Sequence, residues 1–137
     1  MVSVEQKDEY ANWLKTLAWE WFATLTLRDG IGRRAADAKF RYWIEFLEER
    51  EGQKIRWFRV TEFGGESGHR HFHALIAGVR RTPTVIAELQ WARLAGSAEI
   101  DEFDGERNGI GYLLKQLEDG DDLDFDASGL ASGPRRL

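Results

Sequence analysis

The 137-residue chain contains no cysteine, only two prolines and no apolar run that approaches 18 residues. Without cysteine it has neither a disulfide framework nor a thiolate metal site. Without a long apolar run, no segment is expected to span a membrane. The N-terminal residues lack the basic flank and apolar core of a signal peptide, so the sequence favours a cytoplasmic protein with no membrane partner.

Basic charge is also scarce overall, because the net charge at pH 7 is −5. A protein with this charge is not expected to hold long duplex DNA tightly. The charge is unevenly distributed, however. Residues 28–81 contain 12 Lys/Arg and 8 Asp/Glu, a net of +4, whereas residues 119–137 contain five Asp and two Arg, a net of −3. Phosphate contacts need only a local basic face, so residues 28–81 are compatible with a nucleic-acid partner.

The pattern of apolar residues predicts four strands and four helices. Strands are expected at 20–27, 54–63, 69–78 and 97–103, and helices at 4–18, 33–50, 84–94 and 107–118. Thr82 is expected to cap the helix that Pro83 opens. Most of the six tryptophans are expected in the core, with one or two available to stack on bases.

The β-α-β-β-α-β order within these elements predicts an α+β fold. It is the order of a ferredoxin-like or RRM-like antiparallel sheet, with helices packed on one face and the other face free for a ligand. Residues 1–118 are expected to form this domain. Residues 119–137 are acidic and rich in Gly and Ser, which predicts a disordered tail.

The three histidines of the chain, His69, His71 and His73, alternate along one predicted strand. Alternate residues of a strand share a face, so Phe72 lies on the other side. His71 and His73 flank this large apolar residue, which suits the buried side, and we take them as ligands. His69 is left to bind phosphate, to support the site or to face solvent. Two imidazoles on a rigid strand form half of a divalent-metal site.

A carboxylate near the same turn would complete the site. Glu62 directly precedes the turn at 64–68, and antiparallel pairing brings it within reach of His71. Glu66, on the turn itself, is the alternative. A His-His-Glu set with open positions suits Mn²⁺ or Mg²⁺ carrying water and a phosphate oxygen. Zn²⁺ would also bind such a set.

A candidate nucleophile lies on the last predicted helix. Tyr112 and Lys115 are three residues apart and therefore share a helical face. Near neutral pH a tyrosine hydroxyl is almost wholly protonated. A neighbouring ammonium group or metal favours the phenolate, which is a usable nucleophile.

Three motifs together resemble those of the HUH endonucleases. Phe22-Ala23-Thr24-Leu25-Thr26-Leu27 resembles their first motif and His71-Phe72-His73 their second. Tyr112-Leu113-Leu114-Lys115 resembles the third motif of the single-tyrosine rolling-circle replication initiators, the Rep proteins. The motifs occur in the family's order over residues 20–118, and the stretch 62–73 is similar to the hairpin of phage and plasmid Reps.

The resemblance implies a metal-dependent enzyme that nicks and rejoins single-stranded DNA. The metal would be held by His71, His73 and Glu62 and would polarise the scissile phosphate. Tyr112 would attack that phosphate, leaving a 5′-phosphotyrosine link and a free 3′-hydroxyl. Lys115 would orient the phosphate or stabilise charge in the transition state.

The resemblance also implies the partners. We expect single-stranded DNA at an origin or hairpin, bound by a monomer, with host replication proteins as further partners. The expected DNA contacts are Thr24, Thr26, Arg28 and Arg70. Two other interpretations remain: an HUH enzyme of the transposase type, which usually works as a dimer, and a non-catalytic module that binds single-stranded nucleic acid.

Overall fold

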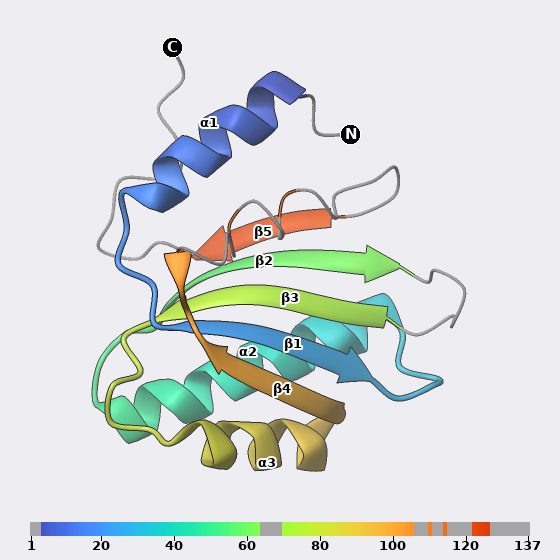
Figure 1. Cartoon of the computed structure of the whole chain (residues 1–137). Helices are drawn as coiled ribbons and strands as arrows, with labels where there is room; N and C mark the ends of the chain where they lie inside the picture. The colour runs from blue at the N-terminus through green and yellow to red at the C-terminus, as the bar shows by residue number, and fades with distance from the viewer. Residues whose placement is uncertain (1–3, 64–69, 106–109, 111–113, 115–121, 127–137) are drawn as a thin grey trace.

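The computed structural model describes residues 4–63, 70–105, 110, 114 and 122–126. At its centre is a five-stranded antiparallel sheet with the strand order β4-β1-β3-β2-β5 (Figure 1). The elements are α1 (Val4–Lys15), β1 (Trp21–Leu27), α2 (Arg33–Glu51), β2 (Arg56–Phe63), β3 (Arg70–Ala77), α3 (Thr84–Leu94), β4 (Gly96–Glu102) and β5 (Asp122–Asp126). The predicted α+β fold with an antiparallel sheet is confirmed.

Helices lie on both faces of this sheet (Figure 1). α2 and α3 cover one face, as the sequence predicts. α1 lies across part of the other face, where Leu14 is fully buried and Trp13 packs edge-on against Phe58 of β2 at 6.4 Å between ring centroids. The expectation of helices on one face therefore applies to α2 and α3, while α1 adds a second, smaller apolar cluster on the face of the histidines.

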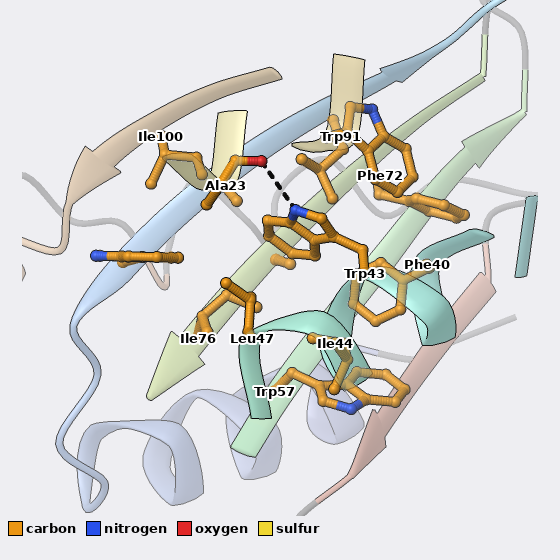
Figure 2. Packing of buried hydrophobic residues seen from close by; sticks show 14 of the residues in the cluster. Ala23, Phe40, Trp43, Ile44, Leu47, Trp57, Phe72, Ile76, Trp91 and Ile100 are labelled. Carbon is orange, nitrogen blue, oxygen red and sulfur yellow. Dashed lines mark hydrogen bonds between the residues drawn. The ribbon is translucent and has the colours of Figure 1, made fainter. Parts of the chain in front are cut away.

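The main core lies between the sheet and the α2–α3 layer (Figure 2). Trp43 and Trp91 are fully buried at its centre with Phe72. The indole of Trp43 donates to the carbonyl oxygen of Ala87 at 2.9 Å, and that of Trp91 donates to the carbonyl oxygen of Thr26 at 3.1 Å. Five tryptophans are buried, namely Trp19, Trp21, Trp43, Trp57 and Trp91. Their expected place in the core is confirmed.

The ends of α2 and α3 show how local signals compete with long-range partners. α2 ends at Gly52, which adopts the left-handed conformation (φ 69°) that glycine tolerates. The prediction that Thr82 caps α3 is wrong. The N-cap residue is Pro83, which makes no side-chain hydrogen bond to the helix. The hydroxyl of Thr82 donates instead to the buried carboxylate of Glu51, because a buried carboxylate needs donors more than a helix end needs a cap.

The acidic C-terminal segment contains a strand, which corrects the predicted disorder for residues 122–126. This strand, β5, pairs with β2 from Trp57↔Asp126 to Thr61↔Asp122. The apolar residues Leu123 and Phe125 alternate with aspartates, and this period of two suits a strand in spite of the net charge. Ile110 and Leu114 are helical, as predicted, and the rest of 107–118 lies outside the described residues.

No helix in the described part of the chain combines the length and the apolar character needed to cross a membrane.

Candidate active site

The histidine motif lies in the middle of the sheet, on the face that carries α1. In the strand register His71 is opposite Glu62 of β2 and opposite Thr26 of β1. His73 is opposite Thr24 on β1. The predicted proximity of Glu62 to His71 across the hairpin is confirmed, because both side chains occupy the same face at neighbouring positions.

Glu62 makes its closest contact with His73, diagonally across the two strands. Its Oε1 lies 3.1 Å from Nε2 of His73, whose side chain is only 9% exposed. The rings of His71 and His73 are nearly parallel, at 10°, with centroids 6.3 Å apart. The motif therefore presents two aligned imidazoles and one carboxylate on adjacent strands.

Thr26 orients the second imidazole. Its hydroxyl lies 3.2 Å from Nδ1 of His71, within hydrogen-bond distance. A ring nitrogen engaged in this way leaves the other nitrogen, Nε2, for a ligand. Polar neighbours of this kind commonly fix the orientation of metal-binding imidazoles.

Two imidazoles and one carboxylate are donors that divalent cations accept, and their placement fits such an ion in part. Two adjacent ligand atoms of an octahedral cation are about 3 Å apart when each lies 2.0–2.1 Å from the ion. The Glu62–His73 separation of 3.1 Å matches this spacing. Within the described ranges, however, no three His, Cys, Asp or Glu side chains are gathered tightly enough to form a complete metal site. His71 shares the face but stands apart from the Glu62–His73 contact.

The described neighbours of Tyr112 lie on this same face. Ile110 and Leu114 are buried in the cluster that α1 forms with β2 and β3 on the histidine face. Phe22 packs against that cluster, and its ring centroid is 6.4 Å from that of His73. Tyr112 and Lys115 themselves, with His69 and Glu66, lie outside the described residues.

The predicted DNA-contacting residues divide between the two faces. Thr24 and Thr26 lie on the histidine face. Arg28 is exposed and donates to the carbonyl oxygens of Ala92 and Leu94, both at 3.3 Å. It therefore caps the C-terminal end of α3. Arg70 precedes His71 and therefore points to the α2 side, where its Nη1 donates to the carbonyl oxygen of Ile31 at 3.1 Å.

Arg59 is a buried charge that was not predicted from the sequence. Its guanidinium is within 4.6 Å of the ring centroids of Phe40 and Phe72, and Nη2 donates to Asp37 at 2.9 Å. Burial raises the pKa of Asp37, but hydrogen bonds from Arg59 and Arg41 outweigh that effect and hold it below its ordinary value. The signal was present in the alternation of β2, which places Arg59 on the same face as Trp57.

The chain matches a known protein family over most of its length. Residues 20–121 match the protein family described as Replication-associated protein ORF2. The match includes all three motifs discussed above. No curated protein and no solved structure matches the chain.

Proposed function

The chain belongs to the Replication-associated protein ORF2 family, and from this membership we propose that it is a metal-dependent endonuclease that nicks and rejoins single-stranded DNA. In this role it initiates rolling-circle replication of a plasmid, phage or virus. The observation that carries the proposal is the histidine face. His71, His73 and Glu62 share that face on adjacent strands, and the described residues Ile110 and Leu114 are buried on the same face.

A cation, Mn²⁺ or Mg²⁺, would be held by His71, His73 and Glu62. When bound, it would polarise the scissile phosphate as a Lewis acid. The protein supplies the orientation of these ligands: the contact of Thr26 with His71 sets one imidazole, and the burial of His73 restricts the other. Residues held on two adjacent strands need little reorganisation when a substrate arrives.

Tyr112 is the nucleophile of the proposed reaction. Its phenolic oxygen forms a bond to the scissile phosphorus while the bond from phosphorus to the 3′-oxygen breaks. The phosphate remains on the tyrosine as a 5′-phosphotyrosine. The phenol gives up one proton as it attacks, and the leaving 3′-oxygen takes up one proton to become a free hydroxyl, so the step is balanced. Attack of that hydroxyl on the phosphotyrosine reverses the step and rejoins the strand. Lys115 stabilises the charge that develops on the phosphate.

Covalent capture tests this function. The protein is incubated with a pool of randomised single-stranded DNA and Mn²⁺, and adducts are resolved on a denaturing gel. We expect a shifted band from the wild type and from Tyr42→Phe, whose side chain is 56% exposed on α2, on the other face of the sheet. The band should be lost in Tyr112→Phe, in the double variant His71→Ala with His73→Ala, and in EDTA.

Two outcomes would contradict the proposal. An adduct that persists in Tyr112→Phe would assign the nucleophile to another residue. If the wild type binds single-stranded DNA but forms no adduct, the chain is a non-catalytic binding module. A third outcome, an adduct that is restored when the inactive tyrosine and histidine variants are mixed, would indicate a dimeric site of the transposase type.

A further inference from the structure

A basic cavity lies on the face of the sheet opposite the histidines, where α2 begins. Its volume is about 450 Å³, within the range of small-ligand sites. Four arginines line it: Arg33, Arg34, Arg59 and Arg70. The one acidic residue in its lining is Asp37, so the lining carries an excess of three positive charges. Among the described residues, none of the proposed metal ligands His71, His73 and Glu62 is part of this lining.

The cavity nevertheless lies directly behind that site. Its wall includes Thr61 and Phe72, which face each other across β2 and β3. The next pair along the same two strands is Glu62 and His71, on the other face. Successive residues of a strand point to opposite sides, so the two sites are separated by the thickness of the sheet.

The N-terminus of α2 adds positive potential to the cavity. Gly32 caps this 19-residue helix without a side-chain hydrogen bond, and its first turn contains no acidic residue. Arg33 and Arg34 occupy that turn instead, next to the positive end of the helix dipole. Two cations at this end are electrostatically unfavourable, and a bound anion would compensate them.

The deeper arginines are held in place before any ligand arrives. Arg59 is 7% exposed; its guanidinium lies 4.6 Å from the ring centroids of both Phe40 and Phe72, and Nη2 donates to Asp37. Arg70 is tied to the carbonyl oxygen of Ile31. Guanidinium groups that are already oriented lose little conformational entropy when they bind an anion, which favours affinity.

We propose that this cavity binds a phosphate-bearing anion of nucleotide size. Arginine forks match phosphate oxygens in pairs, and four arginines line this cavity. A lone phosphate would leave much of 450 Å³ empty, whereas a nucleoside monophosphate is large enough to occupy more of it. The same chemistry is offered by a free nucleotide and by a nucleotide unit of a single DNA strand that passes round the end of the sheet.

The test uses two probes with the full chain in EDTA, so that nicking does not interfere. Thymidine 5′-monophosphate is titrated by calorimetry, and a fluorescent dT₁₂ oligonucleotide is titrated by anisotropy. The variants are Arg34→Gln, which is exposed at the cavity, and Arg70→Gln, which lines its wall. The control is Arg50→Gln, which removes one exposed positive charge from the other end of α2. Thermal melting verifies that each variant is folded.

We expect the cavity variants to weaken binding about 10- to 100-fold, as for loss of one charge-assisted hydrogen bond. The control should change it by less than about twofold. If the cavity variants bind thymidine 5′-monophosphate more weakly than the wild type, the ligand is a free nucleotide. If they bind only the oligonucleotide more weakly, the ligand is the DNA backbone. The proposal is overturned if neither probe binds the wild type, or if Arg50→Gln weakens both probes as much as the cavity variants do. Loss of adduct formation with anion binding intact would contradict only the nicking function.

Discussion

At the residue scale, Thr26 is the side chain that distinguishes the two imidazoles of the proposed metal site. Its hydroxyl contacts Nδ1 of His71, whereas no described residue makes a hydrogen bond to the Thr24 side chain, although Thr24 is opposite His73 in the register. The two threonines have the same size and lie on the same face of β1. Substituting each threonine in turn therefore distinguishes the effect of orienting the His71 ring from the effect of changed packing on this face.

Thr26→Val is expected to lower the affinity for Mn²⁺ about 10- to 100-fold, the usual effect of removing a group that orients a ligand. Calorimetric titration of Mn²⁺ into the DNA-free protein measures it. Thr24→Val should leave the Mn²⁺ affinity within about twofold of wild type. Equal losses in both variants would mean that the contact with His71 has no orienting role.

Asp37 links the buried charge of Arg59 to stability and to pH. Because its pKa is lowered in the folded protein, the carboxylate contributes stability above its ordinary value of 3.8. That contribution is lost as the pH falls through the lowered value, where the folded state also takes up the proton. Its size is limited because the side chain of Asp37 is 40% exposed and partly screened by water.

Asp37→Asn is expected to lower the free energy of unfolding by about 0.5–1.5 kcal/mol at pH 7. Urea denaturation measured from pH 7 to pH 3 should show the difference from wild type shrinking below about pH 4. Glu45→Gln, an exposed carboxylate change on the same helix, should have little effect at any pH. A difference that stays constant with pH would show that the charge of Asp37 does not contribute.

At the element scale, the two ends of α2 carry arginines in electrostatically opposite settings. Arg34 lies in the first turn, at the positive end of the dipole, and Arg50 lies in the last turn, at the negative end. Arg50 therefore stabilises the helix and Arg34 weakens it. A residue kept where it lowers stability is typical of a functional site.

Arg34→Glu is expected to raise the free energy of unfolding by about 0.3–1 kcal/mol and to reduce binding of thymidine 5′-monophosphate. Arg50→Glu should lower stability by a similar amount and leave binding unchanged. Thermal and urea denaturation of both variants measure whether the free energy of unfolding rises or falls. If the free energy of unfolding changes in the same direction in both variants, the helix dipole is not the cause.

At the scale of the whole molecule, β5 extends the sheet beyond β2. Five residue pairs join them, and without β5 the strand β2 becomes an edge. An exposed edge loses ladder hydrogen bonds and offers unpaired backbone groups to other chains. Residues 122–126 of the acidic C-terminal segment are therefore part of the fold as well as a source of negative charge.

A chain ending at residue 121 is expected to be about 1–3 kcal/mol less stable than a chain ending at residue 126, from the loss of several ladder hydrogen bonds. The shorter chain should also self-associate. Urea denaturation and size-exclusion chromatography compare the two. Equal stability and a monomeric state for both would show that β5 does not support the fold.

Short-range patterns determined much of this protein from the sequence alone. Alternation along 70–77 placed His71 and His73 on one face and Arg70 with Phe72 on the other, and the length of the intervening turn brought Glu62 opposite His71. These features depend on a period of two and on one hairpin, so neighbouring residues suffice to predict them.

Only the tertiary structure decided the features that depend on partners far apart in the chain. In the tertiary structure Thr82 bonds to Glu51 instead of capping α3, and Arg59 pairs with Asp37. α1 packs on the histidine face, and β5 pairs with β2. The tertiary structure also created the arginine-lined cavity, because α2, β2 and β3 supply its walls from separate segments. Such contacts have no period in the sequence. They follow from which surfaces are buried together, and a buried polar group then takes whichever partner the packing brings to it.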